Sequence, residues 1–227
     1  YYFQATDNTS CGNKIQLPSS QCYQFVVLFP TISCITPPVN TYPYIQSFSN
    51  LIRGVSDLAP NGWENEITDD LNWYVDTILS GANRPLTDNT GGSNQKYLYV
   101  NNSYKTPNSL ANIISPCFNL KLNTDYFLEF FFHQWGDPNK SFNVDIYANN
   151  KWHLNVIAPA LGNLGSNWKK RAINLSAYSG QTIKIRFRSV SQNYNSTGGI
   201  AVDDFRIIEY PSANTSIESF ITPIQPE

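Results

Sequence analysis

The sequence predicts an all-β fold: a two-sheet antiparallel β-sandwich of the jelly-roll type, with a short N-terminal β-hairpin extension. The chain has 227 residues, of which 14% are charged and 14% aromatic, and about one residue in eight is Asn. A soluble helix needs Ala, Leu, Glu, Lys and Arg on its exposed face, whereas this chain relies on Asn, Ser and Thr for its polar residues. Short alternating segments are separated by turn residues, which is typical of sandwiches.

Two segments show the strand period most clearly. Residues 142–148 and 183–188 alternate apolar and polar side chains, so Val144 and Phe187 each belong to an apolar face. Segment 126–132 is apolar on both faces apart from Glu129, which indicates a central strand. The remaining predicted strands are 97–100, 112–115, 152–157, 171–175 and 200–208.

The domain organisation follows from shifts in composition. Segments 1–7 and 24–27 predict a two-stranded hairpin, which is marginal alone, so residues 1–35 are expected to end a preceding module or to be a docked extension. The Pro37-Pro38 pair predicts a linker over 36–44, followed by the main domain over 45–210 and a C-terminal linker over 211–227. Because the chain begins at Tyr1 rather than Met, we expect a segment of a longer multidomain protein.

Charge and hydropathy exclude two classes of partner. The net charge is −2, so no strong field attracts nucleic acid. The longest apolar runs, such as 25–29, are far shorter than the roughly 20 residues that span a bilayer, so no membrane insertion is expected.

Four cysteines allow three disulfide pairings. Their spacing does not fit a zinc site. Reduced cysteines remain an alternative, but the even count and the composition favour an oxidising, extracellular compartment. We favour a local pair, Cys11 with Cys22, and a long-range pair, Cys34 with Cys117.

No catalytic motif is present, so the chain is not expected to be an enzyme. There is no Gly-x-Ser-x-Gly, and His133 and His153 have no partners that the sequence identifies. Glycoside hydrolysis would need two carboxylates across a cleft, and most acidic residues here fall in turns.

Short motifs follow one another along the chain at 41–48, Gly62-Trp63, Asp69–Trp73, 97–100, 115–120, 128–136, Trp168, 175–180 and 200–205. In this order they resemble the MAM-like domains of large surface and secreted proteins of the Bacteroidota and the related cleaved-adhesin modules of gingipains. The resemblance covers roughly residues 41–210, and the N-terminal segment resembles the end of an Ig- or fibronectin-like module.

This resemblance implies a jelly roll that works outside the cell or on its surface, usually without catalysis. Its expected function is adhesion or assembly, with a cell-surface glycan or protein, or neighbouring modules of the same polypeptide, as partners. The alternative is a carbohydrate-binding accessory module of a secreted hydrolase or protease. Fold alone does not fix which of these applies.

The resemblance also implies one structural Ca²⁺. The family places its two aspartate pairs close in space, here Asp69-Asp70 and Asp203-Asp204, and Ca²⁺ takes six to eight oxygen ligands. The alternative is that these carboxylates only accept backbone N–H groups. One ligand that the resemblance implies is missing, because Ser49 stands where the family has glutamate.

Aromatic side chains are the candidate ligand-binding residues. Trp63, Trp73 and Trp168 match framework positions and are expected in the core. Trp135 and Trp152 lie near strand ends, where they could stack on a sugar or pack inside, and Tyr104 and Tyr194 lie in loops.

A second candidate surface is basic. Lys184, Arg186 and Arg188 project from one strand face, where they could form a stripe for an acidic partner or an ordinary solvated face.

Overall fold

The computed structural model describes residues 5–6, 14–15, 34–77, 84–91, 96–136, 140–191, 194 and 197–210. The chain divides into two compact units, residues 1–31 and 32–227. In the first unit, β1 (Ala5–Thr6) pairs antiparallel with β2 (Lys14–Ile15). The segment 24–27, predicted as the second strand of the hairpin, lies outside the described residues, as do Cys11 and Cys22.

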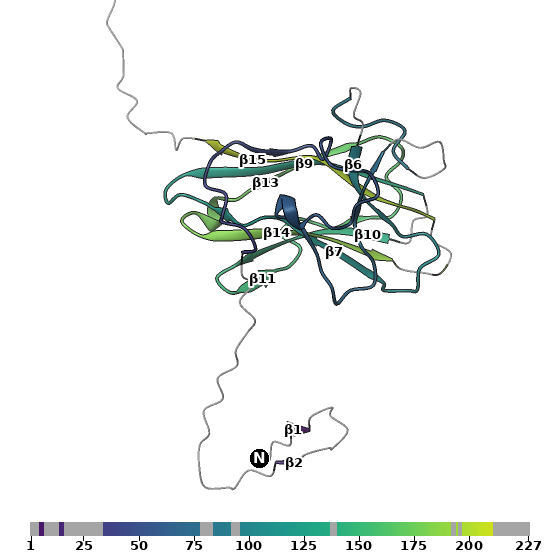
Figure 1. Ribbon diagram of the computed structural model, residues 1–227, viewed down its shortest axis with the longest axis horizontal. Coiled ribbons are helices and arrows are strands. Elements are labelled where there is room, and N and C mark those ends of the chain that lie inside the picture. Colours follow the sequence, from purple (N-terminus) through teal and green to yellow (C-terminus); the bar gives the residue numbers. More distant parts are fainter. Residues whose placement is uncertain are drawn as a thin grey trace, which may run out of the picture. The chain divides into compact units, whose positions relative to one another are not determined.

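The second unit is a sandwich of two antiparallel sheets, which confirms the predicted fold class (Figure 1). One sheet has seven strands: five in the order β11-β10-β14-β7-β4, with β12 also pairing to β10 and β8 also pairing to β14. Its strands are β4 (Glu64–Asn65), β7 (Leu110–Ile114), β8 (Phe118–Asn119), β10 (Lys140–Ala148), β11 (Lys151–His153), β12 (Ala160–Leu161) and β14 (Thr182–Ser191).

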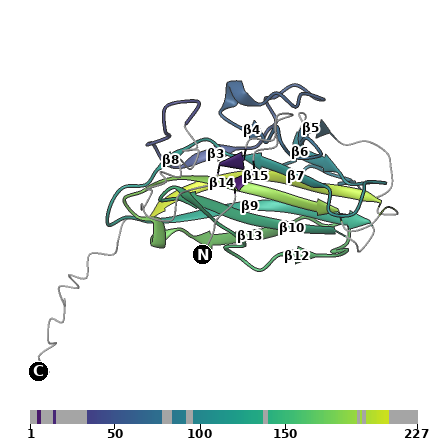
Figure 2. The ribbon, with the colours of Figure 1, turned by 90° about the horizontal axis from the view of Figure 1, so that it is seen from below.

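The other sheet has six strands in the order β13-β9-β15-β6-β5, with β3 pairing to β15. Figure 2 views the same sandwich from below. The strands of this sheet are β3 (Tyr44–Gln46), β5 (Tyr74–Thr77), β6 (Lys96–Asn101), β9 (Asp125–Gly136), β13 (Lys169–Asn174) and β15 (Gly198–Tyr210).

Helical structure within the described residues is limited to two 3₁₀ turns, η1 (Ala59–Asn61) and η2 (Ser176–Tyr178). None of the described helices is long and apolar enough to cross a membrane. The segment 152–157, expected as one strand, is strand only to His153, although Val156 still donates its N–H to the Val144 carbonyl.

The core lies between the sheets because alternate residues of each long strand point inward. Val144 of β10 lies opposite Phe187 of β14, and both are buried. Phe187 packs against Phe130 of β9 with ring centroids 4.8 Å apart, which joins the two sheets. Trp63 and Trp73 are fully buried, as the sequence predicts.

Residues 34–44, which include the segment expected as a linker, run along the sandwich. A disulfide joins Cys34 to Cys117, with Cα atoms 5.8 Å apart, which confirms the predicted long-range pairing. Val39 donates its N–H to the Cys117 carbonyl and accepts from Asn119. Tyr42 packs edge-on against Tyr126. The start of the second unit is therefore fastened to the edge of the sandwich.

Candidate functional sites on the sandwich

The outer side of the seven-stranded sheet carries a network of charged side chains, which we call the charged face: Glu64, Glu66, Asp145, Lys184, Arg186 and Arg188. Strand alternation places them outside because Val144, Ile185 and Phe187 point into the core. Asp145 is at the centre and is fully buried. It accepts hydrogen bonds from Arg186 Nε (3.0 Å), Arg188 Nε (2.9 Å) and the Asn155 N–H (2.9 Å).

Burial by itself would raise the pKa of Asp145. The hydrogen bonds from Arg188, Asn155 and Arg186 outweigh that effect and hold the pKa below its usual range. Lys184 pairs with Glu64 (3.1 Å). The predicted basic stripe is therefore neutralised by carboxylates rather than open to an acidic partner.

Trp152 lies at the β11 margin of the charged face. The Arg186 guanidinium sits over its ring, 4.1 Å from the centroid, and the Tyr147 ring packs edge-on at 5.4 Å. Trp152 is half-buried. The ring of Trp152, a predicted ligand-binding residue, therefore already contacts two side chains of the protein itself.

The predicted calcium ligands Asp69 and Asp70 lie at the opposite margin of the same sheet. Asp69 Oδ2 accepts the Asn112 N–H, and Asp70 Oδ2 accepts the Leu110 N–H (2.8 Å), so both extend the edge of β7. Burial raises the pKa of Asp69 to about 6, and the charges of Glu66 and Asp70 add to the effect.

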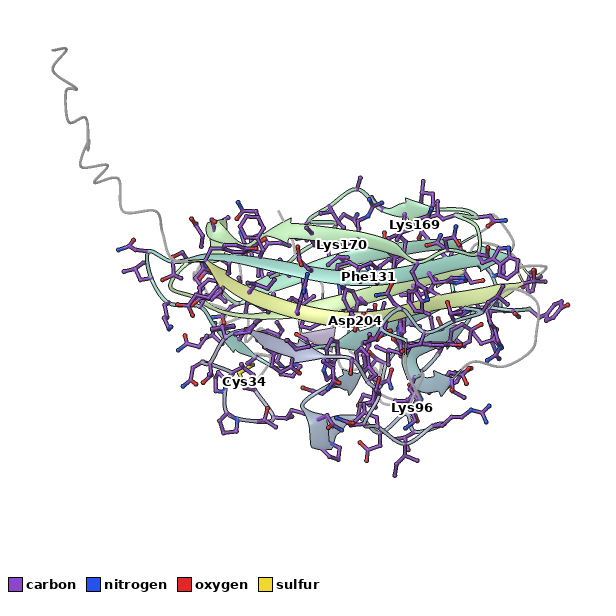
Figure 3. All side chains as sticks on the ribbon, turned by 90° about the horizontal axis from the view of Figure 1, so that it is seen from above. Cys34, Lys96, Phe131, Lys169, Lys170 and Asp204 are labelled. Atoms are coloured by element: carbon purple, nitrogen blue, oxygen red, sulfur yellow. A yellow bond between two sulfur atoms is a disulfide. The ribbon has the colours of Figure 1, made fainter. Side chains whose placement is uncertain are left out.

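Asp203 and Asp204 lie in the six-stranded sheet, at the β-bulge of β15. Together with Asp88 they form what we call the acid cluster. Asp203 is fully buried, and burial followed by the nearby carboxyls of Asp88 and Asp204 raises its pKa to about 9. Both carboxylate oxygens of Asp88 are buried without a donor. Figure 3 shows Asp204 on β15, Phe131 on the neighbouring β9, and Lys170 on β13 on the far side of β9.

The four aspartates predicted as one calcium site thus have separate partners in different sheets. Asp204 turns to Asn89 Nδ2 (2.6 Å) and Thr90 Oγ1 rather than to Asp88. Among the described residues, no three His, Cys, Asp or Glu side chains converge as ligands of one ion. The sequence offered no signal for Asp88, which is a single acidic residue in a loop.

One end of the sandwich gathers the other predicted ligand residues. Tyr104 lies in the β6–β7 loop and is 74% exposed, and Tyr194 lies in the β14–β15 loop and is 62% exposed. The two loops are joined by hydrogen bonds from Asn102 N–H to the Gly198 carbonyl (3.1 Å) and from Asn108 N–H to the Ser191 carbonyl (2.6 Å). We call this region the loop end. Trp135, half-buried near the end of β9, is at the same end.

The outer side of the six-stranded sheet holds a buried aromatic group that the sequence did not predict. Trp168, expected in the central core, instead packs against Tyr97 (5.7 Å) and His133 (5.6 Å) on this outer side. Its Nε1–H donates to the Thr87 carbonyl (2.7 Å), which fastens the loop 84–91 over the sheet.

Both histidines pack against aromatic rings. His133 is 1% exposed, and burial lowers its pKa to about 4, so its ring is neutral at physiological pH. His153 packs edge-on against Tyr178 at 5.6 Å.

Comparison with known proteins agrees with this architecture. A model of the MAM domain (meprin/A5/mu) matches residues 57–212. The mouse MAM domain-containing glycosylphosphatidylinositol anchor protein 1 is 28% identical over 179 residues, covering 74% of this chain and 18% of that protein. The human protein is 29% identical over 153 residues, covering 63% and 15%. The chain therefore spans less than a fifth of the length of these relatives.

Two solved structures are similar to this chain at low sequence identity. The K1 cleaved adhesin domain of Lys-gingipain from Porphyromonas gingivalis W83 is 14% identical, with a TM-score of 0.46, over 74% of this chain and 98% of that one. TmCBM61, solved with beta-1,4-galactotriose, is 14% identical, with a TM-score of 0.46, over 72% and 94%.

Proposed function

The chain belongs to the MAM domain family, and from that premise we propose that it is a non-catalytic extracellular adhesion module within a larger surface or secreted protein. The relatives named above are described as anchor proteins that contain MAM domains, which supports an extracellular setting. Its partners are then a cell-surface protein or glycan, or neighbouring modules of the same polypeptide.

The exposed tyrosines of the loop end are the observation that carries this proposal. Tyr104 and Tyr194 present large side chains to solvent from two loops that hydrogen bonds hold together. Tyrosine loses little conformational entropy on binding and is enriched at interfaces, so two exposed tyrosines at one end of the sandwich favour protein contact.

The test is a binding comparison of the native chain with the double variant Tyr104→Ala/Tyr194→Ala. Binding of labelled chain to immobilised extracellular-matrix proteins and its self-association in sedimentation are measured together. We expect the double variant to lose at least tenfold in affinity, since interface tyrosines are frequent hot spots. The control is Leu122→Ala, which removes a side chain that is 70% exposed before the start of β9, at the other end. Equal loss in both variants, or no loss in either, contradicts the proposal.

Carbohydrate recognition, as an accessory module of a secreted enzyme, is the second candidate function. The half-buried Trp152 favours it, because one ring face is fixed by Arg186 while the residue retains exposure to solvent. A glycan array probed with the native chain, Trp152→Ala and Trp135→Ala tests it. Glycan binding that is lost in Trp152→Ala but kept in Trp135→Ala supports this function. The absence of binding by the native chain argues against it.

One structural Ca²⁺ remains part of the proposal. The acid cluster offers the donor-free oxygens of Asp88 beside Asp203, which suit a hard cation. A bound ion there would supply positive charge between two buried carboxylates and so fasten loop 84–91 to β15. Thermal unfolding with calcium and with chelator tests it, since a ligand that binds only the folded state raises the melting temperature.

A further inference from the structure

We propose that β13 (Lys169–Asn174), the edge strand of the six-stranded sheet, is a docking site for an extended acidic peptide segment, which adds to the sheet as a further strand. We call this strand edge, with its three cations Lys169, Lys170 and Arg171, the basic edge. It is a surface other than the loop end, and the proposal does not rest on the adhesive role of the exposed tyrosines.

The backbone of β13 is open along its outer side. The pairing with β9 runs in register from Lys169 to Asn174, and one residue further the Leu175 N–H donates to the Tyr126 carbonyl (2.8 Å). Alternate residues of an antiparallel strand direct their N–H and C=O groups toward the partner. Lys170, Ala172 and Asn174 therefore direct theirs away from β9, and no backbone hydrogen bond joins these three to another described residue.

The opposite edge of the same sheet is closed. There β5 is the last strand, and the segment 54–55 runs along it: the Gly54 N–H donates to the Val75 carbonyl (2.7 Å), and the Val75 N–H donates to the Val55 carbonyl (3.0 Å). No described segment covers β13 in this way, and five of its six residues are exposed. An exposed edge is a template for one more strand, so this sheet can be extended on the β13 side.

The basic edge carries positive charge that the described residues do not neutralise. Lys170 pairs with Glu129 (2.8 Å), but the same carboxylate also pairs with Arg206. Lys169 and Arg171 form no ion pair with any described carboxylate. The cations of the charged face, by contrast, are paired with carboxylates. Charge complementarity therefore selects an acidic partner for the basic edge, although the chain as a whole has a net charge of −2.

The cations flank the edge and do not share one face of the sheet. Lys169 lies opposite the core residue Phe132, and the Arg171 guanidinium sits over the same ring, 5.4 Å from its centroid. Lys170, the next residue along β13 in Figure 3, points to the outer side of the sheet, as strand alternation requires. No single face presents all three cations. A strand along the edge reaches all of them, because its own side chains also alternate between the two faces.

The same charge disfavours a second copy of this chain as the occupant. Pairing β13 with the β13 of another copy would bring three more cations to the edge and no carboxylate from either strand. Lysine on an exposed edge strand is a common means of preventing such self-pairing. The basic edge therefore discriminates between strands by charge, which admits an acidic segment and rejects a basic one.

The experiment measures fluorescence anisotropy of a labelled peptide of alternating glutamate and valine with the full chain. Two further peptides are compared: one of alternating lysine and valine, and the acidic peptide methylated on every backbone nitrogen. We expect the acidic peptide to bind. The basic peptide should bind at least tenfold more weakly because its charge is repelled, and the methylated peptide equally so because it cannot form the backbone ladder.

A pair of charge variants assigns the binding to the basic edge. Lys169→Glu/Arg171→Glu should weaken binding of the acidic peptide at least tenfold, because it replaces attraction by repulsion. Lys105→Glu/Lys151→Glu is the matched control, since it makes the same change of charge at two solvent-accessible positions outside β13. The control should retain the affinity of the native chain.

A backbone variant separates strand addition from attraction by charge alone. Ala172→Pro removes one outward N–H and keeps every charge, and proline is tolerated on edge strands whose N–H faces solvent. We expect at least threefold weaker binding than in Ala172→Ser, which keeps the N–H. Thermal unfolding checks that both variants fold, and the methylated peptide tests the same ladder should Ala172→Pro not fold.

The proposal is overturned if the acidic peptide does not bind, if the methylated peptide binds equally well, or if both charge variants lose affinity to the same extent. Heparin is the probe for a polyanion held by charge alone. Heparin binding that exceeds peptide binding and is unchanged in Ala172→Pro also overturns the proposal. Tyr104→Ala/Tyr194→Ala should bind the acidic peptide like the native chain, so failure here is distinguishable from failure of the adhesive function.

Discussion

Asp145 and Asp203 are both fully buried, one in each sheet, yet their pKa values are shifted in opposite directions. Asp145 lies opposite Arg186 in the strand ladder and accepts hydrogen bonds from two guanidinium groups. Asp203 lies opposite Phe131 and meets another carboxyl, that of Asp88. The first has a lowered pKa and the second a raised one.

The difference shows that burial alone does not decide the charge of a carboxyl. Burial raises the pKa of both groups, and the neighbours then decide the outcome. Stability linked to Asp145 is present above its unfolded pKa of about 4 and is lost as pH falls through the folded value. Stability linked to Asp203 is present below about 4 and is lost as pH rises toward 9. The contributions of these two carboxyls to stability therefore change with pH in opposite directions.

Asp145→Asn should have the largest effect, because it leaves the partly buried Arg186 and Arg188 beside a neutral partner. Removing one partner of a buried ion pair costs about 3–5 kcal/mol. Urea unfolding at pH 7 measures this, and the difference from the native chain should shrink as pH falls below 4. A constant difference at all pH values would show that Asp145 acts by shape and not by charge.

Asp203→Asn should have the next largest effect and the opposite sign. The amide imitates the carboxyl that stays protonated in the folded native chain, whereas at pH 7–8 the native carboxyl ionises on unfolding and so favours the unfolded state. In chelator at pH 7–8 the variant should therefore be more stable, by about 1–3 kcal/mol. Near pH 4 the difference should become small, because the carboxyl is then largely protonated in the unfolded chain as well. Asp57→Asn, at an exposed position, is the control and should show no such pH dependence. Destabilisation at every pH would mean that Asp203 is ionised in the folded state.

Trp168→Phe should cost about 1 kcal/mol, the usual net value of one hydrogen bond, because it removes the bond from Nε1 to the Thr87 carbonyl. The consequence is local, since that bond fastens loop 84–91 over the six-stranded sheet. Hydrogen exchange should accelerate in residues 84–91 and stay unchanged in β7. Acceleration throughout the sheet would assign Trp168 a core role instead.

Glu209→Gln should have the smallest effect. Its ion pair with Lys121 has two hydrogen bonds of 2.9 and 3.0 Å, but the Lys121 side chain is 56% exposed. Exposed pairs contribute little because water screens them. No measurable change in the urea midpoint is expected, and a clear loss would show that the contrast between buried and exposed carboxylates has been overstated.

Strand prediction succeeded where a single periodicity carried the information. Segments 142–148 and 183–188 lie within β10 and β14, because alternation along each strand reports which face is buried. The strand predicted over 152–157 was too long. It ends at His153, and Val156 only donates one backbone hydrogen bond to β10.

Site prediction was less complete because sites combine distant residues. The exposure of Tyr104 and Tyr194 follows from their loop positions, and Cys34 was paired correctly with Cys117. The four aspartates were expected together. In the structure Asp69 and Asp70 accept hydrogen bonds from the backbone of β7, whereas Asp203 and Asp204 lie in the bulge of β15. Nothing near Asp203 in the sequence identifies Asp88 as its neighbour.

The sequence by itself determined the all-β class, the long strands and their inward faces, because these depend on short-range alternation and turn chemistry. Only the tertiary structure decided the ionisation of each buried group and the partners of each acidic pair. Those depend on side chains brought together from strands far apart in the chain, where a guanidinium or a second carboxyl a few ångströms away reverses the sign of the effect.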